Sequence, residues 1–296
     1  MYIKFWVDAA RVHTLPIALS GILLSALIAY SRDHYDVGIF FMSCITSLLL
    51  QILANFSNDY GDAVKGTDSF FRMGPPRVIS SGYISRECMK KAIGFITIVY
   101  LISSTILIWI SFKNYKGIAP IFFIIGIFTC LYASIKYTVG KNAYGYKGMG
   151  DVSVFLFFGL TSVLGSYFLY THRVEWDIFL LAISIGLLST SVLNLNNMRD
   201  INGDRQNGKY TFVVKIGLQI AKLYHIFLVL TPFVLGSFFV MLNKQTQFYR
   251  WAFLILLFPI FFNIKKVFSR TNFDKEIKNM AIITFLYALF MGLGQV

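Results

Sequence analysis

Charged residues are scarce in this chain. Asp, Glu, Lys and Arg make up 14% of its 296 residues, whereas 56% are hydrophobic, and the mean hydropathy is +0.65. Charges account for about a quarter of an ordinary soluble domain. This composition therefore excludes a soluble fold and indicates an integral membrane protein.

Cysteine is nearly absent as well. Cys44, Cys88 and Cys130 lie far apart and lack the paired spacing of a thiolate metal site or a disulfide framework. The four histidines are equally dispersed. The sequence therefore predicts neither disulfides nor a metal site built from Cys or His.

Long apolar runs dominate the chain. A helix needs about 20 mainly apolar residues to cross the hydrocarbon core of a membrane. We therefore expect an all-α integral membrane fold, with about nine transmembrane helices forming one bundle around a central cavity. The nine runs are 12–30, 38–57, 92–112, 118–137, 152–170, 176–196, 222–242, 249–267 and 279–295.

Lys and Arg are distributed unevenly between the two expected sides of the membrane. The N-terminus and every second loop after it carry 21 of the 27 basic residues. Basic residues collect on the cytoplasmic side, so we expect a multi-pass protein of the cell inner membrane with a cytoplasmic N-terminus. The net charge of +13 then follows topology and anionic lipid, and nucleic acid is not an expected partner.

Two stretches concentrate the rare acidic residues. The stretch NDYGDAVKGTD, residues 58–68, follows the second apolar run, and NMRDINGDR, residues 197–205, follows the sixth. Together they hold five of the 14 acidic residues, on loops that the charge pattern assigns to the cytoplasmic side. Carboxylates at the end of a membrane bundle need a positive partner. Two such groups predict divalent metal that carries a polyanionic substrate.

Helical spacing selects the candidate ligands. Asn58 and Asp62 are four residues apart and share a helix face, and Asp59 is three residues from Asp62. Asp68 lies off that face unless the helix breaks at Gly66. In the second stretch, residues 200 and 204 form a matching pair of carboxylates.

Basic residues accompany both stretches. Arg and Lys supply directional hydrogen bonds to phosphate oxygens, and a bound Mg²⁺ ion neutralises the charge of a leaving diphosphate. The candidates for such contacts are Arg77, Arg199, Arg205 and Lys209.

A weak internal repeat relates the two stretches. The pattern N-x-x-N ends the second run at 55–58 and the sixth at 194–197. We expect a single domain, 1–296, that contains two related four-helix halves, 12–137 and 152–267, with 279–295 as a closing helix.

The paired motifs resemble those of the UbiA superfamily of membrane prenyltransferases. Residues 196–217 (NNMRDINGDRQNGKYTFVVKIG) are similar to the signature of the branch that prenylates 1,4-dihydroxy-2-naphthoate in menaquinone biosynthesis. Three further stretches agree, and the likeness runs from about residue 11 to 217. Those stretches are RVHTLP at 11–16, GPPRVISSG at 74–82 and residues 137–151.

The resemblance implies Mg²⁺-dependent transfer of a polyprenyl group from polyprenyl diphosphate to the naphthoate, with decarboxylation to demethylmenaquinone, inside membrane lipid. It implies two Mg²⁺ ions, with Mn²⁺ as a possible substitute, held among Asn58, Asp59, Asp62, Asp68, Asp200 and Asp204. Asp62, Asp200 and Asp204 would be the catalytic residues, and Arg77, Arg199 and Lys209 would contact the diphosphate. Many members carry a third Asp at the position of Gly66, which leaves the role of Asp68 open. An acceptor site formed by Tyr137, Tyr144 and Asp151 is a further expectation.

Two alternatives remain open at this level. A sister enzyme of the same superfamily would use another acceptor, such as 4-hydroxybenzoate, homogentisate or haem. A transporter would place its charged site near the middle of the bilayer, often in broken helices. Both acidic stretches here lie at one membrane surface, which favours an enzyme.

Overall fold

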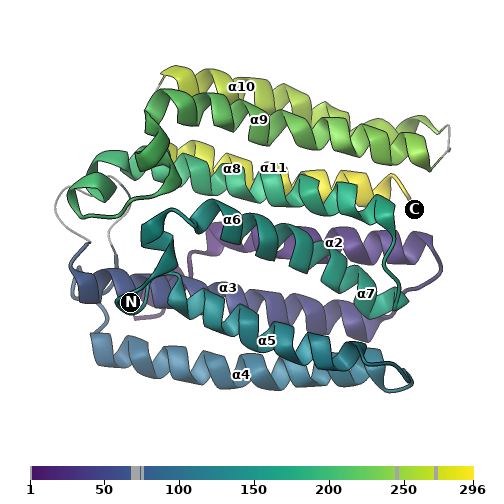
Figure 1. Cartoon of the computed structure of the whole chain (residues 1–296), viewed down its shortest axis with the longest axis horizontal. Coiled ribbons are helices and arrows are strands. Elements are labelled where there is room, and N and C mark those ends of the chain that lie inside the picture. The colour runs from purple at the N-terminus through teal and green to yellow at the C-terminus, as the bar shows by residue number, and fades with distance from the viewer. Residues whose placement is uncertain (1, 68–73, 75–76, 244–246, 270–272) are drawn as a thin grey trace.

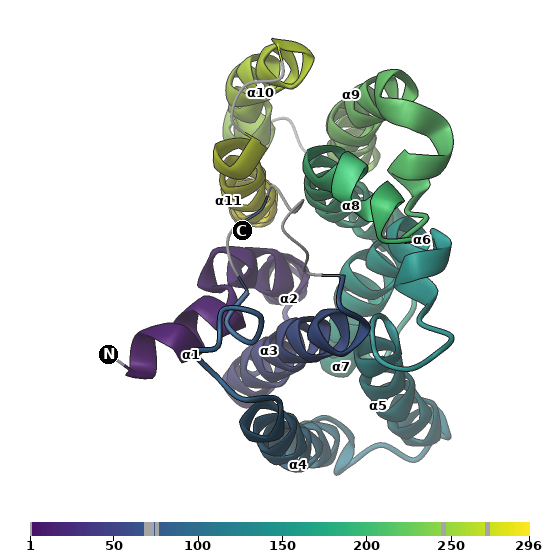
Figure 2. The ribbon, with the colours of Figure 1, turned by 90° about the vertical axis from the view of Figure 1, so that its left-hand side faces the viewer.

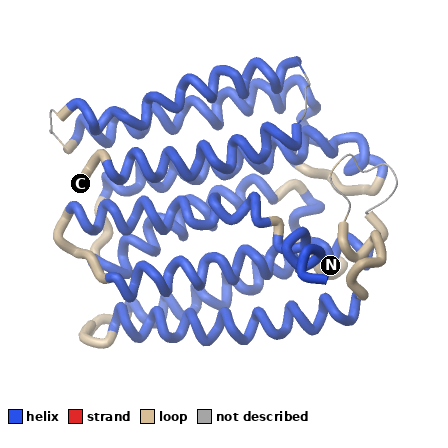
Figure 3. Tube along the Cα trace, turned by 180° about the vertical axis from the view of Figure 1, so that it is seen from behind, coloured by secondary structure: helices blue, strands red, loops and turns tan. Residues whose placement is uncertain are grey.

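The computed structural model describes residues 2–67, 74, 77–243, 247–269 and 273–296. Every regular element within these ranges is a helix (Figures 1 and 3). In chain order they are α1 (Tyr2–Ala10), η1 (Val12–Thr14), α2 (Leu15–Ser31), α3 (Val37–Lys65), α4 (Arg86–Phe112), α5 (Ala119–Lys136), η2 (Tyr144–Lys147), α6 (Gly150–Val154), η3 (Phe155–Gly165), α7 (Ser166–Thr171), α8 (Trp176–Gln206), α9 (Phe212–Leu242), η4 (Phe248–Leu256), α10 (Leu257–Ser269) and α11 (Phe273–Leu293).

Nine helical segments of the described residues are long and apolar enough to cross a membrane. The expectation of about nine transmembrane helices is confirmed, and the protein is a multi-pass membrane protein. The segments are Ile3–Ser31, Val37–Lys65, Arg86–Phe112, Ala119–Lys136, Gly150–Thr171, Trp176–Gln206, Phe212–Leu242, Phe248–Ser269 and Phe273–Leu293.

The long helices lie side by side along one axis of the molecule (Figure 1). Seen end-on, α4 and α10 lie at opposite edges of the bundle (Figure 2). Helix α11 packs against both α2 and α8, and so links the first and last thirds of the chain. The division into halves 12–137 and 152–267 stays a prediction.

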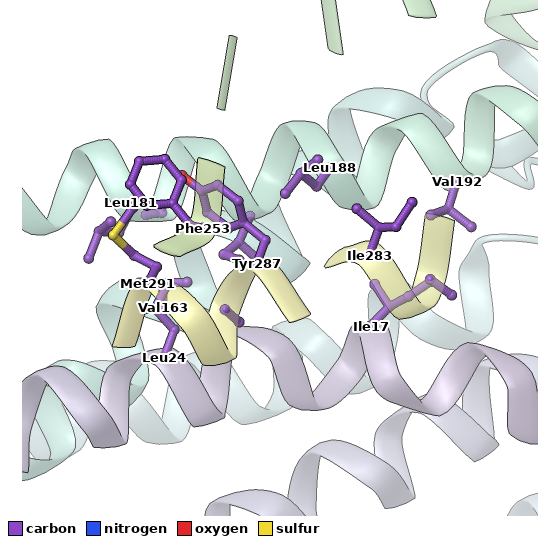
Figure 4. Packing of buried hydrophobic residues seen from close by; sticks show 14 of the residues in the cluster. Ile17, Leu24, Val163, Leu181, Leu188, Val192, Phe253, Ile283, Tyr287 and Met291 are labelled. Carbon is purple, nitrogen blue, oxygen red and sulfur yellow. The ribbon is translucent and has the colours of Figure 1, made fainter. Parts of the chain in front are cut away.

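Helix α8 forms the centre of the packing. In the most apolar stretch of α8, 72% of the residues are buried inside the protein, whereas only 6% are buried in the corresponding stretch of α5. Helix α8 is therefore mostly surrounded by protein, and α5 faces lipid. Figure 4 shows part of this core, where α8 meets α2 and α11. The contributing side chains are Ile17, Leu24, Val163, Leu181, Leu188, Val192, Phe253, Ile283, Tyr287 and Met291.

Helices α3 and α8 continue well beyond the apolar runs from which they were predicted. Helix α3 ends only where Gly66 adopts a left-handed conformation (φ 69°), and α8 continues to Gln206, just before Gly208 (φ 68°). No residue before these glycines enforces a break, so the helical hydrogen bonds continue. The expectation that both acidic motifs lie on loops was therefore wrong for Asp59, Asp62, Asp200 and Asp204, which lie in the last turns of these helices.

Glycine allows one close contact between membrane helices. Segment η3 is a π-helix, and it packs against α8. A Cβ atom on Gly159 would lie 2.6 Å from the backbone of Ala182 and of Gly186. Such small-residue contacts bring helix backbones together within membranes.

We predict that Gly159→Ala destabilises the bundle. The added methyl group meets rigid backbone, and overpacking of this kind costs about 1–3 kcal/mol. The thermal unfolding midpoint of the purified protein in detergent should fall. Gly165→Ala is the matched control, because a Cβ there has no atom within 4 Å. An equal midpoint for the two variants would contradict the close contact.

Candidate active site

The four motif carboxylates are buried at the ends of two helices. Asp59 and Asp62 lie in the last turns of α3, and Asp200 and Asp204 lie in the last turns of α8. Their exposed fractions are only 2%, 5%, 7% and 8%. A buried carboxylate is costly without a positive or hydrogen-bonding partner. Asp68, the fifth acidic residue of the motifs, lies outside the described residues.

A cavity of about 890 Å³ is lined by residues from both helix ends. One part of its lining is strongly polar, whereas another part, from the membrane-spanning segments, is apolar. The polar residues include Asn58, Asp59, Asp62, Arg77, Asn196, Asn197, Arg199 and Lys209, and the apolar ones include Ile17, Val154, Phe157, Phe158, Val192 and Leu193. The cavity can therefore hold a molecule with a charged head and a hydrocarbon body.

Arg77 is the counter-charge of the first motif. Its Nε atom lies 3.5 Å from Oδ1 of Asp59, and its Nη2 atom lies 3.5 Å from Oδ2 of Asp62. The Arg77 side chain is itself only 13% exposed. One guanidinium thus serves two buried carboxylates, and Arg77 also lines the cavity.

Arg199 is held between two acidic residues. It forms a bidentate pair with Asp200, with Nε–Oδ1 and Nη2–Oδ2 distances of 2.9 and 2.7 Å. Its Nη1 atom donates to Oδ1 of Asp274 at 2.5 Å, and Nη2 also donates to Oδ1 of Asn196 at 2.7 Å. The planar guanidinium suits this forked arrangement. Arg199 is also part of the cavity lining.

The second motif is less open to the cavity than the first. Among the described residues that line the cavity, Asp200 and Asp204 do not occur. The Oδ1 atom of Asp204 forms an ion pair with Lys209 Nζ at 3.4 Å. Its Oδ2 atom is buried without a hydrogen-bond partner among the described residues. Arg199 and Lys209 thus stand between these carboxylates and the cavity.

Asn58 is fixed by a contact between α3 and the chain that follows α5. Thr138 Oγ1 donates to the Asn58 Oδ1 atom at 3.1 Å and to the Ser57 carbonyl at 3.0 Å. Gly61 permits the approach, because a Cβ there would lie 2.8 Å from Thr138 Oγ1. The shared face of Asn58 and Asp62 on one helix is confirmed, and both line the cavity.

Tyr146 joins the two motifs and was not predicted from the sequence. Its hydroxyl donates to Asp62 Oδ1 at 2.7 Å and lies 2.7 Å from Thr67 Oγ1. The Nζ atoms of Lys65 and Lys209 lie 3.7 and 5.7 Å from the centre of its ring, within the range of cation–π attraction. Tyr146 lies within the stretch 137–151 that resembles the family, but the resemblance assigned it no role.

The three residues expected to contact an acceptor differ in position. Tyr137 and Tyr144 line the cavity, with ring centres 5.3 Å apart and rings nearly perpendicular. Asp151 is buried in α6 but is not part of the described lining. Burial, together with the nearby carboxylates of Asp151, Asp62 and Asp204, raises the pKa of Tyr137. Tyr137 therefore lies within electrostatic reach of both motifs, and its hydroxyl stays protonated at neutral pH.

The two ends of the chain also contribute to the cavity. His13 and Arg11 come from the segment before α2, and Asp274 and Lys278 come from the first turns of α11. The sequence reasoning assigned a role to none of them. Arg11 and His13 belong to the stretch 11–16 that resembles the family. Asp274 and Lys278 lie outside that likeness, and only the packing of α11 against α2 and α8 reveals them.

The site offers oxygen ligands suited to Mg²⁺. Among the described residues, no three acidic, histidine or cysteine side chains form a ready-made metal cluster. Mg²⁺ is commonly bound by one or two carboxylates together with substrate phosphates. Asp62, with a short link to Tyr146, and Asp204, with a buried and unsatisfied oxygen, fit such a ligand set.

Solved structures share this fold. The apo structure of a UbiA homolog from Aeropyrum pernix K1 superimposes with a TM-score of 0.67 at 14% identity and covers 95% of each chain. A structure of digeranylgeranylglyceryl phosphate synthase gives a TM-score of 0.62 at 18% identity, covering 99% of this chain and 98% of that one. At such low identity these matches establish the fold alone.

Sequence comparison reaches further. The chain is 36% identical over 299 residues to 1,4-dihydroxy-2-naphthoate octaprenyltransferase of Escherichia coli (strain K12), covering 98% of this chain and 96% of that protein. It is 40% identical over 226 residues to the protein of the same name from Haemophilus influenzae, covering 75% and 72%. The UbiA prenyltransferase family pattern matches residues 16–290. With its helical bundle and paired acidic helix ends, this chain belongs to the UbiA prenyltransferase family.

Proposed function

We propose that this protein transfers a polyprenyl group from polyprenyl diphosphate to 1,4-dihydroxy-2-naphthoate. The carbon–oxygen bond of the diphosphate breaks, and a carbon–carbon bond forms at the carboxyl-bearing carbon of the naphthalene ring. Carbon dioxide leaves from the carboxylate, which restores the aromatic ring and gives the hydroquinone form of demethylmenaquinone, with diphosphate as the other product. The names of the relatives from E. coli and H. influenzae support this acceptor.

One observation carries the proposal: a single cavity joins a charged lining to an apolar one. The charged part suits a diphosphate, and the apolar part, with Phe157 and Phe158, suits a prenyl chain. A carbocation formed there is shielded from water by the surrounding helices. A transporter does not need a charged site joined to a large apolar cavity at one membrane surface, so an enzyme is favoured.

Mg²⁺ is the proposed metal, as two ions, with Mn²⁺ as a substitute. Asn58, Asp59, Asp62, Asp200 and Asp204 would hold it together with the substrate, and Asp68 stays a candidate. When bound, the metal supplies neutralisation of the charge that develops on the departing diphosphate. Of these residues, Asp62, Asp200 and Asp204 are the proposed catalytic set.

Arg77, Arg199 and Lys209 are the proposed diphosphate contacts. Each now lies against motif carboxylates, at distances between 2.7 and 3.5 Å. A diphosphate competes for the same donors, because charge-assisted bonds to phosphate are as strong as those to carboxylate. Substrate entry would therefore release carboxylate oxygens for metal at the moment the diphosphate binds.

Tyr137 and Tyr144 are the proposed acceptor contacts, since their protonated hydroxyls can donate to an oxygen of the naphthoate. Burial raises the pKa of Tyr144 as it does that of Tyr137. Asp151 does not line the cavity, and it would act indirectly, by helping to raise the pKa of Tyr137. The concentration of Lys and Arg supports a cytoplasmic position for the motif end of the bundle in the cell inner membrane.

We predict the acceptor preference directly. The purified protein, incubated with Mg²⁺, a polyprenyl diphosphate and a panel of aromatic acceptors, should form a decarboxylated product with 1,4-dihydroxy-2-naphthoate, detected by mass spectrometry. Chelation of the metal should stop turnover. Product from 4-hydroxybenzoate or homogentisate, with none from the naphthoate, would assign the protein to the sister activity instead.

We also predict that Tyr146 positions Asp62 for metal binding. Tyr146→Phe removes the hydroxyl that bonds Asp62 but keeps the ring between Lys65 and Lys209. Loss of a hydrogen bond to a charged group costs about 1.5–3 kcal/mol. We expect the Mg²⁺ concentration for half-maximal rate to rise about tenfold or more, while the KM for the acceptor stays unchanged.

Tyr210→Phe is the matched control for this prediction. Tyr210 is 56% exposed, and its backbone N–H donates to the Tyr146 carbonyl at 3.0 Å, a bond that this substitution leaves in place. This variant should keep the Mg²⁺ dependence of the unmodified protein. A Tyr146→Phe enzyme with the same Mg²⁺ dependence as this control would remove Tyr146 from the site.

A further inference from the structure

A second, smaller cavity lies far from the acidic motifs, at the other end of the bundle. It has a volume of about 70 Å³ and is lined by the ends of α2 and α9, the start of η4 and the segment after α11. One water position needs about 10–15 Å³ on this measure, so the space holds a group the size of a phosphate. The lining residues are Ile28, Ser31, Arg32, Phe239, Asn243, Arg250 and Gln295.

Arg250 is a buried cation with neutral partners. It is 4% exposed, and its Nε and Nη1 atoms donate to side-chain oxygens of Gln247 and Gln295 at 2.9 and 2.7 Å. No described carboxylate lies within ion-pair distance of it, and its Nη2 atom donates to no described residue. Arginine is almost never fully buried unless paired with an anion.

Gln295 adds a second donor that lacks a partner. The residue is 8% exposed, and its Oε1 atom accepts from Arg250. Its Nε2 atom is buried and has no hydrogen-bond partner among the described residues. Arg250 and Gln295 therefore border the same small space, and the Gln295 amide offers it a buried N–H donor that has no acceptor among the described residues.

Arg32, the other cation of this cavity, is already neutralised. Its Nη1 and Nη2 atoms form ion pairs with Glu175 and Asp177, and Nη1 also donates to the Tyr167 hydroxyl. These carboxylates do not line the cavity. The positive charge that remains uncompensated at the cavity is that of Arg250, which matches the single negative charge of a phosphodiester.

The surroundings favour a lipid as the source of that phosphate. Phe248 and Tyr249, next to Arg250, are 91% and 50% exposed, and Met241 and Leu242 at the end of α9 are 64% and 62% exposed. Apolar and aromatic side chains of this kind face the acyl chains and headgroups at the membrane surface. We propose that Arg250 and Gln295 form a site for a phosphate group, supplied by a phospholipid headgroup, at the end of the bundle opposite the acidic motifs.

Thermal unfolding of the delipidated protein in detergent tests this site. A ligand that binds the folded state raises the midpoint with its concentration. We expect phosphatidylglycerol to raise the midpoint and diacylglycerol of the same chain length to have no such effect. A shift with inorganic phosphate alone would support the phosphate site and assign a free anion as its ligand. No shift with either phosphate compound would overturn the proposal.

Three variants locate the effect. Arg250→Gln should raise the half-saturating phosphatidylglycerol concentration at least tenfold, whereas Arg173→Gln, an exposed arginine on the α7–α8 connection, should respond as the unmodified protein does. Gln295→Glu keeps the size of the side chain and places a carboxylate beside Arg250. It should fold and lose the response, even if Arg250→Gln does not fold. A Gln295→Glu protein that responds like the unmodified one would also overturn the proposal.

Discussion

Buried carboxylates need positive partners, and this need determines how side chains are arranged where α3 and α8 end. Asp59 and Asp62 share Arg77, Asp200 holds Arg199, and Asp204 contacts Lys209. In a low-dielectric setting an unpaired member of such a pair is strongly destabilising. The basic side chains that a diphosphate would bind are therefore the same ones that now stabilise the motifs. In the proposed reaction, substrate binding and release of the carboxylates would be a single exchange.

The rest of the fold holds the side chains of the two motifs in position. Most of the apolar part of helix α8 is buried inside the protein, and the helix carries the second motif beyond the apolar core without a break. Helix α11 packs against it and brings Asp274 to Arg199. Charge pairing matters at the opposite end of the bundle as well. There Arg32 forms ion pairs with Glu175 and Asp177, whereas Arg250 donates hydrogen bonds to the amides of Gln247 and Gln295.

Much of the architecture could be predicted from the sequence, because hydrophobic length and charge distribution are local properties. Nine spans and the convergence of both motifs on one cavity follow from them. The ends of α3 and α8 could not be predicted, since a helix that leaves the apolar core continues until a residue such as Gly66 ends it. Tyr146 and Asp274 escaped prediction because their contacts join segments that only tertiary packing brings together.

The central claim is that the two acidic helix ends form one catalytic site. The most direct test is a double-mutant cycle on kcat/KM with Asp62→Asn, Asp204→Asn and the combined variant. Residues that act on the same diphosphate and metal are strongly non-additive, so the double variant should be little slower than the slower single one. If the losses of the two single variants multiply in the double variant, the motifs act independently and the claim is wrong.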